Sequence, residues 1–355
     1  MTISVPLATS ASRINSLEAN FPVPTSNRDV NSRSAIFSLE GLSDIRFYIS
    51  RTFSEREGRQ SVPSAMTGED AYLPTARRFS LYESCCVRQI AHMTQFDLHQ
   101  QDCVEGMATL PSEHVDLVVT SPPYNLGVRY QKYSDRQDRQ TYLEWCEKWA
   151  AEVRRVLRPT GSFFLNVGSA PSNPMLPHEI VIALRNVFVL QNTIHWIKSI
   201  SIEGRDGGVR SYGHFKPISS KRFLNDCHEY IFHFTKTGRV EIDRLALAVP
   251  YQDKSNIARW SHTRGSDLRC RGNTWFIPYQ TIQSREKERP HPATFPVQLA
   301  EWCIKLHGVS RVHTMLDPFF GIGNSAIAAQ KCGVKGFIGF EIDEGYLAEA
   351  RRRIG

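Results

Sequence analysis

Two short segments carry residue types and spacings that could do chemistry on a planar ligand. The first is Thr120-Ser-Pro-Pro-Tyr-Asn125. Its two prolines, Pro122 and Pro123, fix the backbone and lack N–H donors, so the Pro122 carbonyl can accept a hydrogen bond. The Ser121 hydroxyl can accept another, and Tyr124 offers a flat face for stacking on a base. Two acceptors would grip an amino group and turn its nitrogen lone pair towards an electrophile. A Pro-Pro turn without chemistry is the alternative.

The second segment is Asp317-Pro-Phe-Phe-Gly-Ile-Gly-Asn-Ser-Ala326. Gly321 and Gly323 let the backbone approach a ligand, and a helix beginning at Asn324 would offer free N–H groups. Glu341 follows Gly323 by 18 residues, at the end of the next expected strand, where a carboxylate can bind ribose hydroxyls. The spacing fits a dinucleotide fingerprint, although a turn that only packs a helix on a strand is an alternative.

The position of this glycine-rich segment restricts the fold. Only 32 residues follow Gly323, enough for one helix, one strand and one more helix. The remaining strands of the sheet must therefore come from upstream, whereas a nicotinamide dehydrogenase usually has this loop at the start of its domain. The order predicts a permuted α/β domain.

From Met93 onward, strand-like runs alternate with helical patterns, which predicts an α/β Rossmann-like fold with a mostly parallel sheet flanked by helices. The predicted strands are Val115–Thr120, Ser162–Val167, Asn192–Lys198, His228–Phe234, Val312–Asp317 and Gly336–Glu341. The predicted helices are Tyr142–Leu157, Glu179–Phe188, Val297–Leu306, Asn324–Lys331 and Glu344–Arg353. The first strand places Ser121 at its carboxyl end, where ligands bind in open α/β sheets.

Two stretches break this alternation. Ser201–Arg222 is rich in Gly, Ser, Arg and Lys, and Arg239–Pro290 has many charges, several aromatics and little periodicity. Both are predicted to be irregular insertions off the sheet.

The first 92 residues differ in composition from the rest. They contain ten Arg, no Lys, nine acidic residues and fifteen Ser, without a sustained hydrophobic period. We expect residues 1–92 to be a disordered or weakly ordered extension. A partner-binding extension and a gene-start artefact with Met93 as the working start are both open. The acidic residues argue against a transit peptide.

Together the two segments resemble the DNA amino-methyltransferases that use S-adenosylmethionine. The catalytic motif comes first, an insertion follows and the cofactor loop comes last, which resembles the β group of that family. The similarity covers roughly Phe96 to the C-terminus. It implies a catalytic domain over 93–355, with target-recognition insertions within 199–290.

The resemblance implies roles for individual residues. Asp102 and Cys103 match the segment whose acid contacts the adenine amino group, and Glu341 matches the acid that binds ribose. His291 lies in a segment that lines the methionine end of the site, although it could instead cap the turn before the next helix. The cofactor-loop residues are Asp317, Phe319, Gly321, Gly323 and Asn324, and the catalytic residues are Ser121, Pro122, Pro123 and Tyr124.

The family motif also bears on the target base. Ser-Pro-Pro-Tyr resembles mostly the cytosine-N4 enzymes, and Asp-Pro-Pro-Tyr mostly the adenine-N6 enzymes. Cytosine is favoured. Adenine stays open because this division is imperfect, and because a hydroxyl can replace a carboxylate as the acceptor, although with less charge assistance. The base must be flipped out of the duplex, and its nitrogen would attack the sulfonium methyl in line. No Pro-Cys pair exists for a cytosine-C5 mechanism.

Double-stranded DNA is the implied partner, and the formal charge of +7 with a pI near 9.0 is compatible with it. For any single basic residue of the insertions, a solvated surface position is an equal alternative. The predicted DNA contacts are Arg205, Arg210, Lys216, Lys221, Arg222, Arg264 and Arg271.

Other classes remain as alternatives. An RNA or protein-amide methyltransferase would share the Pro-Pro-Tyr pocket, and a non-catalytic DNA-binding protein would keep the fold. The eight cysteines form no C-x-x-C pair and no apolar run is long enough to cross a membrane, so we expect no metal, no membrane and a cytoplasmic location. A cognate restriction endonuclease, and a monomer or a homodimer, are left open.

Overall fold

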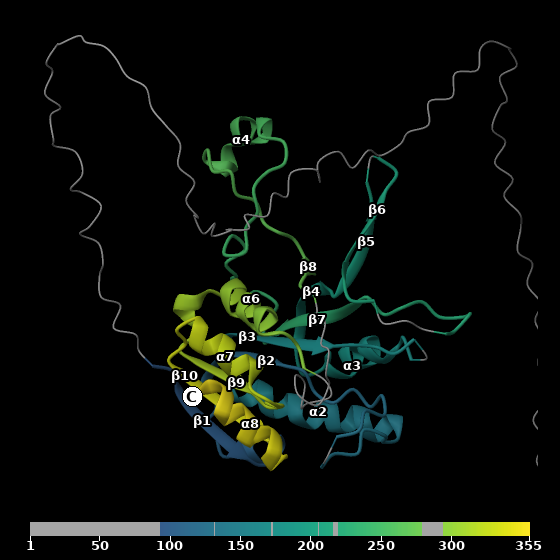
Figure 1. Cartoon of the computed structure of the whole chain (residues 1–355). Helices are drawn as coiled ribbons and strands as arrows, with labels where there is room; N and C mark the ends of the chain where they lie inside the picture. The colour runs from purple at the N-terminus through teal and green to yellow at the C-terminus, as the bar shows by residue number, and fades with distance from the viewer. Residues whose placement is uncertain (1–92, 131, 172, 205, 216–218, 279–293) are drawn as a thin grey trace, which may run out of the picture. The chain divides into compact units, whose positions relative to one another are not determined.

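The computed structural model describes residues 93–130, 132–171, 173–204, 206–215, 219–278 and 294–355. Its centre is an eight-stranded sheet in the order β1-β10-β9-β2-β3-β7-β4-β8 (Figure 1). The β1, β10, β9, β2 and β3 strands run parallel, and β7 is antiparallel to both of its neighbours. The strands are β1 (Gln95–Gln100), β2 (Val115–Thr120), β3 (Leu157–Val167), β4 (Val189–Ile197), β7 (His228–Thr235), β8 (Thr274–Phe276), β9 (Thr314–Asp317) and β10 (Gly336–Glu341).

Helices cover both faces of the sheet. The helices α1, α2 and α3 pack with one hydrophobic core, and α6, α7 and α8 pack with the other. Their bounds are α1 (Cys103–Ala108), α2 (Arg139–Val156), α3 (Leu176–Leu184), α6 (Val297–His307), α7 (Asn324–Lys331) and α8 (Glu344–Ile354). No helix in the described part of the chain is both long and apolar enough to cross a membrane.

The strand β2 shows why the sheet is buried on both faces. All six of its residues are buried. Val118 packs with the α2 side, whereas Leu117 and Val119 pack with the α6 side, because successive side chains of a strand point to opposite faces. An uninterrupted apolar run such as Leu117–Val119 is typical of a strand buried between two helix layers.

The helix α2 follows the predicted amphipathic pattern. Asp138 caps its N-terminus by accepting hydrogen bonds from the backbone N–H groups of Gln140 and Thr141. Tyr142, Cys146, Trp149, Ala150, Val153 and Val156 form its buried face. Because their spacing follows the helical repeat, one stripe of α2 enters the core.

The order in which successive strands are added to the sheet reverses at the boundary between β2 and β9. From β9 it runs through α7 to β10 on one side, and from β2 it runs through α2 to β3 on the other. The two strands are parallel neighbours, with Leu117 beside Met315 and Val118 beside Leu316. Such a switch point opens a crevice at the carboxyl ends of the strands, where ligands bind in sheets of this kind.

The predicted mostly parallel sheet flanked by helices is confirmed, and all the predicted strands and helices of the catalytic part are present. The structure adds β1, α1 and the early part of β3. The predicted helix Tyr142–Leu157 ends one residue later than α2, and the predicted strand Ser162–Val167 begins five residues later than β3. Residues 157–161 begin β3, whose residues are all buried from Gly161 onward.

The prediction that both insertions are irregular and off the sheet was wrong in two places. Ser201–Arg222 contains most of a regular antiparallel ribbon, β5 (Ser199–Glu203) paired with β6 (Val209–Gly213). Within Arg239–Pro290, β8 pairs with β4 and extends the main sheet. The ribbon was missed because its two-sided exposure removes the alternation that reveals half-buried strands.

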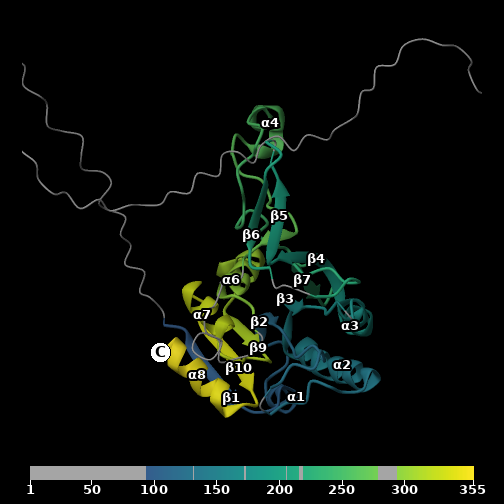
Figure 2. The same ribbon diagram turned by 45° about the vertical axis from the view of Figure 1, so that its right-hand side comes forward.

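The ribbon and the region around α4 (Ser255–Arg259) and the 3-10 helix η1 (Ser261–Thr263) both extend away from the main sheet (Figures 1 and 2). All five residues of β6 are exposed. The predicted extension over residues 1–92 lies outside the described residues.

Candidate active site

One pocket lies at the carboxyl ends of β2, β9 and β10, with an empty volume of about 1020 Å³ including its open mouth. Its lining includes residues 101–103, 121–124, 318–322, 324–325 and 340–343, together with Tyr130, Lys132, Tyr133, Trp145, Thr294, Phe295 and Tyr346. Of the twelve predicted catalytic and cofactor residues that the structure describes, ten line this pocket, and the other two are Asp317 and Gly323. His291 lies outside the described residues. The two segments singled out in the sequence therefore meet in one cavity.

The glycine-rich loop between β9 and α7 is held by a carboxylate. The backbone N–H of Gly321 donates to Glu341 Oε2 at 2.8 Å, and the N–H of Asp343 donates to Oε1 at 2.9 Å. Burial raises the pKa of Glu341, and these two hydrogen bonds act against that rise. Each carboxylate oxygen keeps a lone pair, so Glu341 can still accept from two vicinal hydroxyls.

Gly323 does not line the pocket, because it forms the turn into α7. Its backbone has a positive φ of 84°. An added Cβ would lie 3.2 Å from both the Ala350 Cβ and the Phe320 ring, so a side chain would strain the turn and press on α8. The following residue, Asn324, donates from Nδ2 to the Phe295 carbonyl at 2.6 Å, while its Oδ1 is buried without a hydrogen-bond partner. A ligand donor in the pocket would satisfy this acceptor.

Asp317 lies beneath the pocket rather than on its wall, and only 1% of its surface is exposed. Its Oδ1 accepts from the Thr120 hydroxyl at 2.5 Å and from the Phe319 N–H at 3.1 Å. Its Oδ2 accepts from the Ser325 hydroxyl at 2.6 Å. Burial raises the pKa of Asp317 to about 6, although these hydrogen bonds lower it. The structure thus makes Asp317 a bridge between the catalytic strand and the glycine-rich loop.

Asp102 and Cys103 occupy the start of α1 at the pocket edge. Asp102 Oδ1 caps the helix by accepting from the N–H groups of Val104 and Glu105 at 2.8 and 3.3 Å. Its Oδ2 takes no part in this cap, so it can accept from a ligand amino group. Burial raises the pKa of the Cys103 thiol, which is therefore neutral and acts as an apolar wall.

The Ser-Pro-Pro-Tyr segment is fixed from two sides. The buried Tyr142 hydroxyl of α2 donates to the Pro123 carbonyl at 2.7 Å. The Ser121 and Tyr124 hydroxyls lie 2.5 Å apart, and the Asn166 amide at the end of β3 donates to the Tyr124 oxygen at 2.8 Å. These contacts position the segment's side chains before any ligand arrives.

Sequence reasoning missed the residue that organises the following loop. Asp135 is 2% exposed and accepts hydrogen bonds from the N–H groups of Asn125, Leu126 and Val128 at 2.7, 3.1 and 2.9 Å. Burial raises the pKa of this carboxyl, and the backbone hydrogen bonds oppose that rise. In the sequence, Asp135 is only one acidic residue within a polar loop. Its donors are backbone N–H groups, so no residue type marks them in the sequence.

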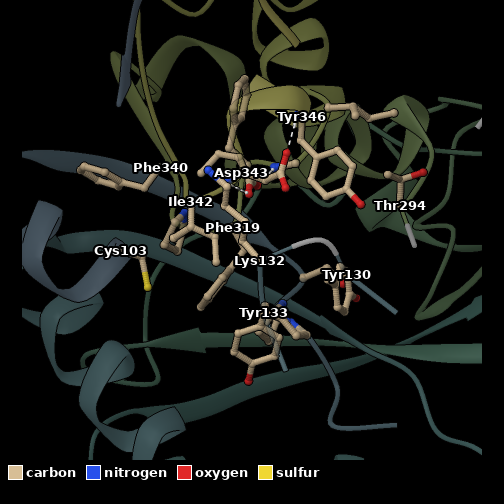
Figure 3. Close-up of a pocket in the computed structure, with 18 of the residues that line it drawn as sticks. Cys103, Tyr130, Lys132, Tyr133, Thr294, Phe319, Phe340, Ile342, Asp343 and Tyr346 are labelled. Carbon is tan, nitrogen blue, oxygen red and sulfur yellow. Dashed lines mark hydrogen bonds between the residues drawn. The ribbon is translucent and has the colours of Figure 1, made fainter. Parts of the chain in front are cut away.

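Aromatic side chains, also missed, enclose the pocket. In Figure 3, Tyr130 and Tyr133 lie on one side and Tyr346 of α8 on the other. Phe319 packs edge-on against Trp145 of α2 with ring centroids 5.5 Å apart. Burial raises the pKa of Tyr130 and Tyr133, so both phenols stay neutral and can stack on a ligand or donate to it.

The five predicted DNA-contacting residues that the structure describes do not line this pocket, and they differ in exposure. Arg210 on β6, Lys221, Arg222 and Arg264 are exposed. Arg271 is half-buried, donates from Nε to the Leu247 carbonyl at 3.1 Å and lies 4.6 Å above the Trp302 ring. It therefore packs the insertion against α6 instead of presenting its whole side chain to solvent. Arg205 and Lys216 lie outside the described residues.

Comparisons with known proteins agree with this geometry. A family model described as DNA methylase, for the N6 and N4 amino group, matches residues 115–352. The type II methyltransferase M.ScaI of Streptomyces caespitosus is 28% identical over 271 residues, covering 72% of this chain and 80% of its own. The DNA adenine methyltransferase YhdJ of Escherichia coli is 27% identical over 263 residues, covering 71% of this chain and 80% of its own.

A solved structure shares the fold. The PvuII DNA methyltransferase, titled cytosine-N4-specific, superposes with a TM-score of 0.54 at 21% identity, covering 74% of this chain and 88% of its own. The likeness confirms the predicted Rossmann-like methyltransferase fold. The match to the family model spans both motif segments in the predicted order.

Proposed function

The chain belongs to the N6/N4 DNA methylase family, and we propose that it methylates the exocyclic N4 amino group of cytosine in double-stranded DNA. S-adenosylmethionine supplies the electrophilic methyl group when bound. The observation that carries the proposal is the single pocket shared by Ser121–Tyr124 and the loop before α7. The acceptors for an amino group would thus lie next to the loop that would hold the cofactor.

The residues around the glycine-rich loop fit that cofactor. Glu341 would accept from the ribose hydroxyls with its remaining lone pairs, and Asp102 Oδ2, which takes no part in the helix cap, would accept from the adenine amino group. Asn324 has a buried, unpartnered Oδ1, and Cys103, Phe319 and other apolar groups line the walls. An amphiphilic ligand with a flat base suits this combination of few polar groups and many apolar ones.

Catalysis in this proposal comes from positioning. Ser121 Oγ and the Pro122 carbonyl accept from the two amino hydrogens, and Tyr124 holds the flipped base by stacking. The grip turns the nitrogen lone pair towards the cofactor side of the pocket, which removes orientational entropy from the barrier. The proton released from the nitrogen leaves to solvent.

Cytosine is favoured over adenine because position 121 is Ser, and the PvuII enzyme of the same fold is titled cytosine-N4-specific. Adenine-N6 is the second candidate, because one relative of 27% identity is named a DNA adenine methyltransferase. The pocket itself suits both bases, since each presents an amino group beside a ring nitrogen.

DNA contacts are proposed for the insertions within 199–290. The β5–β6 ribbon has the form that enters a major groove, and the exposed Arg210, Lys221, Arg222 and Arg264 suit phosphates or base edges. Several relatives are named type II methyltransferases, so a cognate restriction endonuclease is the proposed second partner.

The test is direct. The protein is incubated with labelled S-adenosylmethionine and unmethylated genomic DNA, the DNA is digested to nucleosides, and the methylated nucleoside is identified by mass. N4-methylcytosine supports the proposal, and N6-methyladenine moves the target to adenine with the mechanism kept. No methylated nucleoside, with cofactor still bound, contradicts DNA as the substrate and directs the same assay to RNA and protein amides.

A further inference from the structure

A chain of hydrogen bonds runs from the catalytic serine to an ion pair behind the motif. Ser121 Oγ lies 2.5 Å from the Tyr124 hydroxyl. The Asn166 Nδ2 donates to that hydroxyl oxygen at 2.8 Å and to Glu229 Oε2 at 2.7 Å. Glu229 Oε1 accepts from Lys198 Nζ at 3.1 Å. The Glu229 and Lys198 side chains are 13% and 17% exposed, so the pair is largely shielded from water.

The carboxylate fixes the orientation of the Asn166 amide. An ionised carboxylate can only accept, so the group that faces Glu229 Oε2 must be the NH₂ end of the amide. This orientation leaves Asn166 Oδ1 buried without a hydrogen-bond partner. The opposite flip would set two acceptors against each other across the 2.7 Å contact. The amide therefore donates to the Tyr124 oxygen.

The direction of the hydroxyl hydrogens follows from these donors and acceptors. The Tyr124 hydrogen can point to the backbone carbonyl oxygen of Asn166 at 3.1 Å or to Glu229 Oε2 at 3.4 Å. An anion at that end attracts it, because hydrogen bonds to charged acceptors are the stronger ones. The Ser121 hydrogen then points to the Tyr124 oxygen, and Ser121 Oγ turns its lone pairs into the pocket.

The reverse direction would disable the site. If Tyr124 donated to Ser121, the serine hydrogen would point into the pocket and meet the hydrogens of the target amine. A serine needs an external group to choose between these directions, whereas an aspartate at the same position would accept in either case. Ser121 carries no charge of its own, and the negative charge in this chain of hydrogen bonds is that of the Glu229 carboxylate.

We propose that Glu229 is a positioning residue which, through Asn166, directs the Tyr124 and Ser121 hydrogens so that Ser121 accepts from the target amino group. The inference rests on the proposed amino-methyl transfer. Lys198 compensates the charge that Glu229 carries in this shielded place. Glu229 acts through other residues and does not touch the substrate.

The test compares Glu229→Gln with the wild type in single-turnover methylation of genomic DNA. Glutamine keeps the shape and removes the anion, so we expect the rate to fall about 10- to 100-fold. Affinities for S-adenosylmethionine and for DNA should stay within about twofold. The melting temperature should fall, because the shielded Lys198 ammonium loses its carboxylate partner, so rates are compared well below it. Glu113→Gln is the matched control, because Glu113 also pairs with a lysine, Lys236, but lies at the opposite end of β2. Its rate should equal that of the wild type.

Asn166→Ala provides the second variant, because it removes the amide that relays the direction. Each single change should slow the reaction, and the double change should slow it no further than the larger single effect. Multiplying losses, an unaltered rate in Glu229→Gln, or a parallel loss of cofactor affinity would each overturn the inference. A wild type that methylates no DNA would instead refute the proposed function, so the two failures are distinguishable.

Discussion

The pocket and the β5–β6 ribbon differ in the hydrogen bonds that stabilise them. At the pocket, side chains far apart in the sequence hold one another, as Thr120 and Asp317 do across 197 positions. In the β5–β6 ribbon, the hydrogen bonds are local, and Ser201 pairs with Ser211 only 10 positions away. We propose that the first region fixes atoms for chemistry, while the second presents exposed side chains to DNA. Substitutions in the two regions should therefore affect different measurements.

The strongest test of this difference is at the catalytic segment. Ser121→Ala removes an acceptor, and Tyr124→Ala removes the stacking face, so each should reduce turnover roughly 100-fold or more. Cofactor affinity, measured by calorimetry, should change less than about threefold because neither side chain is assigned to the cofactor. Full activity in both variants would refute the assignment of the motif.

The second test breaks the bridge between the two motif segments. Asp317→Asn cannot accept on both sides, so one hydroxyl donor loses its partner within the core. We expect the free energy of unfolding to fall by about 1–3 kcal/mol, with weaker cofactor binding. Denaturant unfolding measures the first and calorimetry the second. The control is Asp206→Asn in the ribbon, where the exposed carboxylate pairs with Arg210 at 3.5 Å and should contribute little.

The third test concerns how stability depends on pH, and it uses three hydrogen-bonded side chains buried in the core. Ser162 Oγ lies 2.9 Å from both His307 Nδ1 and His233 Nε2. Burial lowers the pKa of His233 from 6.5 to about 3 and that of His307 to about 4. As the pH falls below 6.5 the unfolded chain binds these protons and the native one does not, so stability is lost towards pH 4.

Asp317 opposes this loss, because its raised pKa of about 6 makes the native state take up a proton first. His307→Asn removes one of the two histidines that bind a proton in the unfolded chain only, and it keeps a hydrogen-bond partner for Ser162. The slope of unfolding free energy against pH, between about pH 6 and 4.5, should then fall by about 1.4 kcal/mol per unit. An unchanged slope would show that His307 is protonated in the native protein.

The smallest effects are expected in the insertion. Lys221→Ala with Arg222→Ala should weaken DNA binding several-fold and reduce the salt dependence of affinity by about one to two ion equivalents. The single-turnover rate at saturating DNA should be unchanged. Binding titrations at several salt concentrations measure the effect, and a rate loss at saturation would place these residues in the chemistry. Arg271→Ala should instead lower stability, since this side chain packs on Trp302.

The same difference explains what sequence reasoning could and could not find. The strand Val115–Thr120 and the helix Asn324–Lys331 were predicted to the residue, because burial on both faces or a glycine turn marks them. The ribbon was missed, because no buried face imposes a period on it. Most predicted pocket residues lie in one cavity, since carboxyl ends of parallel strands share an edge.

Residues that support the site were harder to find. Asp135 and Glu229 are isolated acids in the sequence, and their partners are backbone groups or side chains brought close only by folding. Asp317 belongs to the predicted loop, yet its carboxylate is buried beneath the pocket, where it accepts from the Thr120 and Ser325 hydroxyls. Motif spacing identifies the segments that meet a ligand, but not which member of each segment faces it.

The pairing of β1 with β10 and of β2 with β9 also bears on how the protein is made. Each pair joins a strand near the start of the described chain to one near its end. On the ribosome, β1 and β2 emerge long before their partners are translated. The sheet therefore cannot be completed until β9 and β10 have left the exit tunnel, and until then β2 can pair only with β3. The core packed by α6, α7 and α8 can therefore form only after most of the core packed by α1, α2 and α3 has been translated.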